Sequence, residues 1–427
     1  MPAPERPARP ALEVADILRA HGAAYRAGHR VSPQQARVIR HLTTCRTAAL
    51  GGHIDGCARC GFARISYNSC RDRHCPKCQA TQRQQWIETR LEHVLPVAHF
   101  HVVFTLPQEL NPLVLRNQAA LYGLLFQAAS QTLLTLARDR RRLGAQLGFT
   151  AILHTWGQNL LFHPHLHCVV TAGGLSPDGR RWIPTRQDYL LPVKVLGRLF
   201  RGKFLAGLQD LYQSNQLTLR GSTANLADPK AFGALRDRLY RTNWIVYAKP
   251  PFGGLAQVFQ YLGRYSHRVA ISNSRLLSMA DGKVALRYKD YRNGSRWKVM
   301  ILAAEEFIRR FLLHVLPKRF VRIRHYGLMA GRNVTTKLRL ARSLLTPAAP
   351  ESGSSPAPEA ESPPAPPLPD WRQRVLAWTG QDPLRCPYCQ GPLTRRALSE
   401  LLQPPATRAV LSAAGGTGWD SSYYREQ

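Results

Sequence analysis

The chain has 427 residues and carries 59 Lys and Arg against 26 Asp and Glu, a formal charge of +33. Such an excess of cations suits a polyanion, because basic side chains displace condensed counterions from a phosphate backbone. The N-terminus is charged and rich in proline, and we find no apolar run of about 18 residues that could cross a bilayer. The composition therefore favours a cytoplasmic protein that binds nucleic acid, and it disfavours a membrane protein.

Cysteines mark the first region, which we expect to form a module over residues 1–90. Two CxxC pairs lie 14 residues apart: Cys57 with Cys60, and Cys75 with Cys78. Each pair can hold one ion from a tight turn, and two pairs complete the tetrahedral thiolate set that structural zinc prefers. We expect Zn²⁺ rather than disulfides, because cytosolic thiols stay reduced. Three further residues are candidates for an alternative ligand or a second zinc site: Cys45, Cys70 and His74.

Basic side chains surround these cysteines, among them Arg71, Arg73 and Lys77. A closed four-thiolate site has no open position for catalysis. We therefore predict that this module binds DNA and performs no chemistry itself.

The stretch "ILHTWGQNLLFHPHLHCVVTAGGLS" predicts two strands, over residues 150–160 and 165–171, with a turn around Pro164. Successive side chains of a strand point to opposite faces, so His165 and His167 share one face. Two imidazoles on one face can bind a divalent metal ion.

Gln158 is the candidate third ligand of this metal, because it precedes His165 on the neighbouring predicted strand. We expect His154 and His163 to be ordinary histidines. The first lies further from the pair, and the second belongs to the predicted turn.

Residues 255–267 fit a helix, on which Tyr261 and Tyr265 lie one turn apart on the same face, accompanied by Arg264 and Arg268. Tyrosines at this spacing are more often a core stripe. A phenol with a pKa of about 10 is a poor nucleophile, but a metal that polarises a phosphate lowers the barrier to its attack. The product would be a 5′-phosphotyrosine and a free 3′-OH.

Residues 346–370 are rich in Pro, Ala, Ser and Glu and have too few large apolar side chains to form a core, so we predict a disordered linker. A short tail follows over residues 371–427. It contains Cys386 and Cys389, and a lone CxxC pair needs two more ligands before it can hold a metal.

Several of these motifs occur together in the order typical of one known family. They are "CRTAALGGHIDGCARCGFARISYNSCRDRHCPKCQ", "HVVFTLPQELNPL", "HTWGQNLLFHPHLHCVVTAGGLS", "YLGRYSHRVAISN" and "FIRRFLLHVLPKRFVRIRHYGLMA". The chain thus resembles the rolling-circle insertion-sequence transposases of the IS91 group, within the two-tyrosine HUH endonucleases. The resemblance implies an α+β fold, with a nuclease domain over residues 91–345 whose central antiparallel sheet is flanked by helices and preceded by a zinc-binding domain.

The same resemblance implies Mg²⁺ or Mn²⁺ at the nuclease site and Tyr261 and Tyr265 as nucleophiles. It also implies single-stranded DNA and element-end hairpins as partners, with transfer of one strand at a time. Two alternatives remain open: a plasmid replication initiator or relaxase with the same chemistry, and a non-catalytic zinc regulator that binds DNA. The regulator alternative leaves the tyrosines and the histidine pair without a role.

Overall fold

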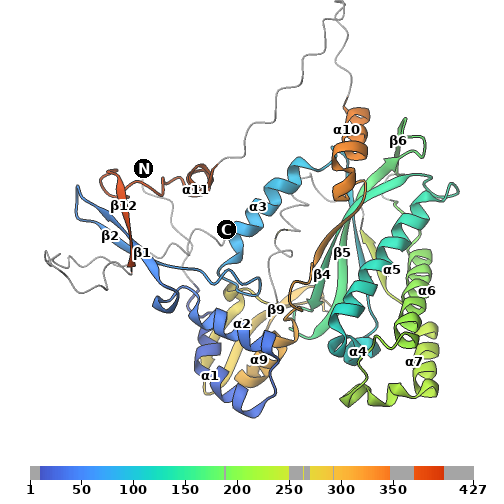
Figure 1. Cartoon of the computed structure of the whole chain (residues 1–427), viewed down its shortest axis with the longest axis horizontal. Coiled ribbons are helices and arrows are strands. Elements are labelled where there is room, and N and C mark those ends of the chain that lie inside the picture. The colour runs from blue at the N-terminus through green and yellow to red at the C-terminus, as the bar shows by residue number, and fades with distance from the viewer. Residues whose placement is uncertain are drawn as a thin grey trace, which may run out of the picture.

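The computed structural model describes residues 10–186, 189–249, 263, 270–291, 293–346 and 370–398. Within them the chain is an α+β fold built on antiparallel sheets flanked by helices, which confirms the expected fold class (Figure 1). The helices are α1 Val14–Gly28, α2 Pro33–Thr44, α3 Gln79–Glu92, α4 Asn111–Arg116, α5 Gln118–Arg138, α6 Val193–Gln213, α7 Pro229–Arg241, α9 Ala304–Leu313, α10 Arg339–Leu345 and α11 Trp371–Thr379. The strands are β1 Gly52–Cys57, β2 Ala63–Tyr67, β3 His99–Thr105, β4 Gln146–Trp156, β5 Phe162–Leu175, β6 Trp182–Pro184, β7 Val246–Lys249, β8 Leu276–Ala280, β9 Lys283–Asp290, β10 Arg296–Ala303, β11 Ile323–Gly327 and β12 Leu393–Ala397.

The central sheet has the strand order β11-β4-β5-β3-β7, with β6 added to β5, and every pairing in it is antiparallel. Helices α4 to α7 lie along one face of it (Figure 1). Alternate strand residues such as Phe104 and Leu166 pack there against Leu125 and Phe200. Burying these side chains removes apolar surface from water, which is the main force that holds the layers together.

Helix α5 is long and apolar enough, by length and composition alone, to cross a membrane. Its apolar residues have another explanation, because Leu121, Leu125 and Phe126 are fully buried in the core of the central sheet. A helix that is buried on most of its surface needs this composition.

A second core joins the N-terminal helices to residues 270–315. Helices α1 and α2 pack with α9 and the sheet β10-β9-β8 around residues such as Ile17, Val38, Val284 and Phe307. Ser32 caps the N-terminus of α2, and its hydroxyl accepts the N–H of Gln35 at 3.2 Å. The N-terminal helices therefore share their core with residues far beyond position 90.

The third sheet has the order β12-β1-β2, so the strand of the tail pairs with the first strand of the chain. Figure 1 shows α3 between this sheet and the central sheet. Ile87 of α3 packs with Ile152 and Val169 of the central sheet, on the face opposite to α5.

The hairpin of β4 and β5 differs from the prediction. Strand β4 ends at Trp156, and residues 157–161 form the turn, in which the N–H of Gly157 donates to the carbonyl of Leu161 at 3.0 Å. Pro164 lies inside β5, where the register with β4 shifts between His154 and Trp156. The predicted turn at Pro164 is wrong, because a proline is tolerated in a strand where the ladder is irregular and needs no donor.

Candidate functional site

Three histidines meet on the face of the central sheet opposite to α5. His154 of β4 lies directly across from His165 of β5, and Ile152 lies across from His167. Residues directly opposite each other in antiparallel strands share a face, so all three imidazoles point the same way. One ring nitrogen from each of them lies within 4.8 Å of the others.

Hydrogen bonds orient two of these rings. Nδ1 of His165 is 2.6 Å from the carbonyl oxygen of His163, to which it donates, and this leaves Nε2 free to bind an ion. Nδ1 of His167 is 2.7 Å from Nε2 of His101 on β3. If Nε2 of His167 keeps its lone pair for a metal, its proton lies on Nδ1 and is donated to His101. A hydrogen bond from the ring nitrogen that does not bind the metal fixes the tautomer and the orientation of a metal-binding histidine.

Burial favours the neutral form of His101, His165 and His167. It lowers the pKa of His165 to about 3 and that of His101 to about 4, where the positive charge of Lys249 adds to the effect. Burial also holds the pKa of His167 well below its ordinary value, and the charge of His154 acts in the same direction. A neutral imidazole has a free lone pair at pH 7, which is the form that binds metals.

The three histidines fit a divalent transition metal. Nε2 of His165 and Nε2 of His167 are 3.0 Å apart, and two ligands at right angles with bonds of about 2.1 Å place their atoms about 3 Å apart. Three protein ligands leave positions open for substrate. Because nitrogen donors favour transition metals over Mg²⁺, the set suits Mn²⁺ better than Mg²⁺.

A third histidine joins the predicted pair. His154, which we had expected to be ordinary, lies in the cluster with His165 and His167. Gln158 lies in the turn after β4, where its backbone carbonyl accepts a hydrogen bond from Arg275, and its role as a metal ligand stays a prediction. The signal was present in the turn residues Gly157 and Asn159, because a turn at this point places His154 opposite His165.

The predicted nucleophiles Tyr261 and Tyr265, and the predicted DNA contacts Arg264 and Arg268, lie outside the described residues. Gly263, between the two tyrosines in sequence, is described and is helical. A Cβ atom at Gly263 would lie 2.3 Å from Cδ1 of Ile87, so the backbone of Gly263 packs closely against this side chain. Since Ile87 packs on Ile152 and Val169, Gly263 lies on the histidine side of the central sheet.

Four cysteines form a separate centre between α2 and α3. Cys45 follows α2, Cys78 precedes α3, and the sulfur atoms of this pair are 3.1 Å apart. Cys75 is 3.6 Å from Cys45, and Cys70 is 3.7 Å from Cys78. A tetrahedral zinc with Zn–S bonds of about 2.3 Å sets its sulfurs about 3.8 Å apart. These four residues, which we call the inner quartet, are free thiols with the composition and spacing of a structural zinc site.

The pairing of the two CxxC motifs differs from the prediction. Cys75 and Cys78 join Cys45 and Cys70, whereas Cys57 and Cys60 lie with Cys386 and Cys389 of the tail in an outer quartet. The reason is the β1–β2 hairpin, which carries the first pair away from α3 and toward β12.

His74 is not a ligand of either quartet. Its Nδ1 donates to Asp72 at 2.8 Å, and its Nε2 accepts the backbone N–H of Leu316 at 3.2 Å. Both ring nitrogens are thus used, which leaves none for a metal.

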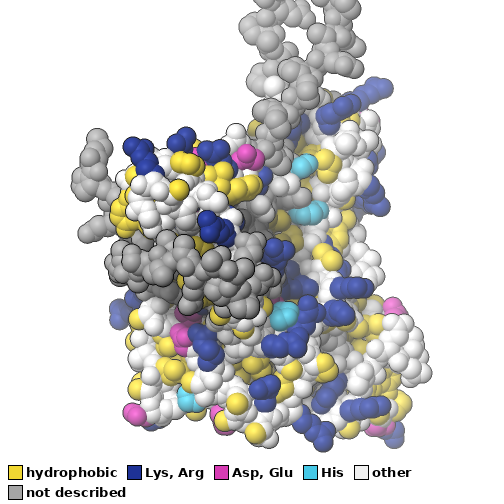
Figure 2. Space-filling view, turned by 60° about the vertical axis from the view of Figure 1, so that its left-hand side comes forward, with side chains coloured by type: hydrophobic (Ala, Val, Ile, Leu, Met, Phe, Trp, Pro, Cys, Tyr) yellow, Lys and Arg dark blue, Asp and Glu magenta, His cyan; other side chains and the backbone are white. Residues whose placement is uncertain are grey.

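Of the basic residues predicted to bind DNA in this module, Lys77 is buried in an ion pair with Glu13. Arg73 donates to the carbonyl of Phe320 at 2.6 Å. Arg71 is exposed. The buried ammonium of Lys77 needs the carboxylate of Glu13, because a buried charge is costly without a partner. A role of Arg71, Arg73 and Lys77 in DNA binding stays a prediction. Figure 2 nevertheless shows Lys and Arg far outnumbering Asp and Glu on the face it presents.

Two family models match the chain. The first, described as "Putative transposase", matches residues 148–337, which include the three histidines. The second, described as "Transposase zinc-binding domain", matches residues 17–106, which include the inner quartet. A protein of Sinorhizobium fredii named "Putative transposase y4qJ" is 49% identical over 383 residues, which cover 90% of this chain and 94% of that protein. The chain belongs to the IS91 family of transposases.

A second relative of the transposase is the "Transposase for insertion sequence element IS801" of Pseudomonas savastanoi pv. phaseolicola. It is 28% identical over 371 residues, covering 83% of this chain and 82% of the relative. No solved structure matches the transposase significantly. The family assignment confirms the resemblance seen in the sequence. The zinc-binding domain and the cysteine clusters support structural Zn²⁺ in the transposase.

Proposed function

We propose that the transposase cuts one DNA strand at the end of an insertion sequence through a 5′-phosphotyrosine, and passes that strand to a target by a rolling-circle mechanism. The observation that carries the proposal is the histidine cluster on the sheet, with Gly263, the residue midway between Tyr261 and Tyr265, on the same side of it. Nucleophile and metal ligands must lie close together for this chemistry.

His154, His165 and His167 would hold the metal, and Mn²⁺ suits these donors better than Mg²⁺. A bound divalent ion polarises the scissile phosphate and offsets the charge that develops on it. The hydrogen bonds from His165 to His163 and from His167 to His101 keep the two rings aimed at one point.

In the cleavage step the tyrosine oxygen attacks phosphorus and the bond from phosphorus to the 3′ oxygen breaks. The phenol loses its proton, the departing 3′ oxygen gains one, and the 5′ phosphate stays on the tyrosine. Attack by a 3′-OH on this ester reverses the step and joins a new strand. Two tyrosines allow one to hold the donor end while the other opens the target.

The DNA partner is single-stranded, including hairpins at the element ends, because the chemistry addresses one strand at a time. The net charge of +33 provides cationic contacts to its phosphates. Exposed basic side chains such as Arg71 would contribute to this binding, together with Arg264 and Arg268. We place this work in the bacterial cytoplasm, where thiolate zinc sites persist.

The test uses the purified full chain, a labelled single-stranded oligonucleotide carrying an element end, and Mn²⁺. Wild type should form a covalent adduct with the 5′ phosphate of the fragment downstream of the cut, and this adduct should survive denaturation. Tyr261→Phe and Tyr265→Phe should each stop complete transposition in cells, while only the double variant loses every adduct. Full transposition by either single variant would overturn the scheme with two nucleophiles, and an adduct in the double variant would overturn both assignments.

A further inference from the structure

The outer quartet brings together cysteines from opposite ends of the chain. Cys57 and Cys60 lie at the end of the β1–β2 hairpin, and Cys386 and Cys389 lie in the loop before β12. Sulfur atoms of Cys60 and Cys386, 326 positions apart in sequence, are 3.5 Å from each other, and those of Cys57 and Cys389 are also 3.5 Å apart. All four lie within 4.8 Å of one another. The zinc-binding family model ends at residue 106 and so contains only half of this quartet.

The two CxxC loops have the same backbone structure. In the first, the N–H of Gly61 donates to the carbonyl of Cys57, and the N–H of Cys57 donates to the carbonyl of Phe62. In the second, Gln390 and Gly391 take the places of Gly61 and Phe62 in the same two bonds with Cys386.

Both loops also turn at the same point, since Gly61 and Gln390 each have a positive φ, of 74° and 57°. A non-glycine residue rarely adopts this conformation unless its surroundings impose it. In each loop, backbone N–H groups point at the sulfur of the first cysteine. Each loop is therefore a knuckle shaped to present two thiolates to one ion.

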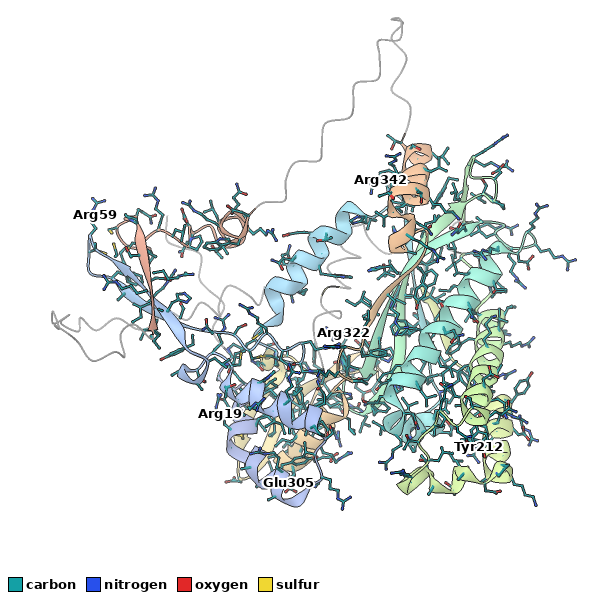
Figure 3. All side chains as sticks on the ribbon, in the orientation of Figure 1. Arg19, Arg59, Tyr212, Glu305, Arg322 and Arg342 are labelled. Carbon is teal, nitrogen blue, oxygen red and sulfur yellow. The ribbon has the colours of Figure 1, made fainter. Side chains whose placement is uncertain are left out.

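The two knuckles pack directly against each other. A Cβ atom at Gly391 would lie 3.4 Å from the sulfur of Cys57 and 3.4 Å from Cβ of Arg59. The rings of Phe62 and Tyr388 are in contact, with centroids 5.3 Å apart. Figure 3 shows Arg59 at the outer end of the hairpin, where the two loops meet.

Strand pairing extends the contact between the hairpin and the tail beyond the four sulfur atoms. Strand β12 pairs with β1 over five residues, from Cys57 opposite Leu393 to His53 opposite Ala397. The carboxylate of Asp55 is buried on β1 and accepts hydrogen bonds from Arg395 of the tail at 2.7 Å and from Arg64 at 3.0 Å. Arg64 also donates to the carbonyl of Pro383 at 3.1 Å. The tail thus completes the sheet of the hairpin.

We propose that Cys57, Cys60, Cys386 and Cys389 bind a second structural zinc ion, which fastens the C-terminal tail to the N-terminal hairpin. Four thiolates on two knuckles are the closed ligand set that structural zinc prefers. Three short strands bury little apolar surface, so their stability as a unit depends on such a metal. The tail is then a part of the zinc-binding module that the chain supplies from its other end.

The docked tail also reaches α3. Nη1 of Arg374 on α11 lies 4.0 Å from the carboxylate of Glu88, one residue after Ile87, which contacts Gly263. Zinc in the outer quartet would therefore hold α11 beside the helix that packs against Gly263. This proposal does not depend on the nuclease mechanism, since its test measures metal content and docking.

The first measurement is the zinc content of the purified, reduced full chain. Wild type should contain two zinc ions, and Cys386→Ser and Cys389→Ser should each contain one, with retained helix content by circular dichroism. Tyr388→Phe is the matched control, because it changes a residue between the two ligands but removes only a hydroxyl and keeps the ring that contacts Phe62. This variant should keep two. One zinc in wild type, or two in Cys386→Ser, would overturn the proposal.

The second measurement needs no change at a cysteine. A protease site is inserted between residues 350 and 365, which the sequence predicts to be a linker, and the cleaved protein is passed through a sizing column in reducing buffer. The C-terminal fragment should co-elute with the body and with two zinc ions, and the same fragment carrying Cys386→Ser should separate. A wild-type fragment that separates in the presence of zinc contradicts the proposed role of the ion.

Discussion

The histidine cluster, which we propose as a catalytic metal site, and the two cysteine quartets are built from different kinds of structural element. The histidines come from neighbouring strands of one rigid sheet, and three ligands leave positions open for a phosphate. The cysteines come from loops and helix ends, and four ligands close the site. The sheet would keep its shape without a metal, because its core lies on the other face, whereas the cysteine regions depend on theirs.

Removing a histidine ligand should therefore abolish chemistry and leave the fold intact. His154→Ala is expected to lower the rate of strand cleavage by about 10³-fold, since a metal ion supplies several kcal/mol of stabilisation to the transition state. DNA affinity should change little, because it comes mainly from contacts to phosphates. Cleavage of a labelled oligonucleotide and a binding titration measure the two effects.

Gln158→Ala is the matched comparison, because Gln158 lies four residues further along the chain, in the turn beyond the pairing of His154 with His165. It should cut at nearly the wild-type rate. The reverse order, with Gln158→Ala inactive and His154→Ala active, would restore the glutamine as third ligand.

Removing a ligand from the inner quartet should instead destabilise the fold. The sulfurs of Cys45, Cys75 and Cys78 are buried in the core shared by α1, α2 and α9, so Cys75→Ser is expected to destabilise that core by on the order of 5 kcal/mol. Thermal unfolding followed by circular dichroism measures the loss.

Cys386→Ser provides the comparison, since the outer quartet holds only the hairpin and the tail. Its melting temperature should fall much less than that of Cys75→Ser. Equal losses in the two variants would mean that the quartets are not independent structural sites.

The smallest expected effect concerns His101, which contacts a ligand and not the ion. His101→Gln should weaken metal binding about 10-fold to 100-fold, as is usual when a hydrogen-bond partner of a metal-binding histidine is lost. Mn²⁺ titration of cleavage would give the shift. His99→Gln, at a buried histidine two residues away on the same strand, should leave the Mn²⁺ requirement unchanged. An equal shift in both variants would assign the effect to packing of β3.

The local pattern of side chains along the sequence predicted part of each site. The alternation of side chains in a strand was enough to place His165 and His167 on one face, because that alternation is a property of the extended backbone itself. It did not identify His154, since partners across a hairpin depend on where the chain turns. A turn at residues 157–161 instead of Pro164 changes which residue faces His165.

The sequence by itself indicated the class of partner, the structural metal and the family of the transposase. Its charge points to nucleic acid, its cysteine pairs to zinc and its order of motifs to the IS91 family, since side-chain type and short spacing are local properties. Only the tertiary structure decided which cysteines share an ion. Cys57 is close to Cys75 in sequence, yet it pairs with residues more than 300 positions away, because the β1–β2 hairpin points away from α3 and offers an edge to β12. Metal ligands are selected by distance in space, and that distance is set by strand pairing and packing throughout the chain.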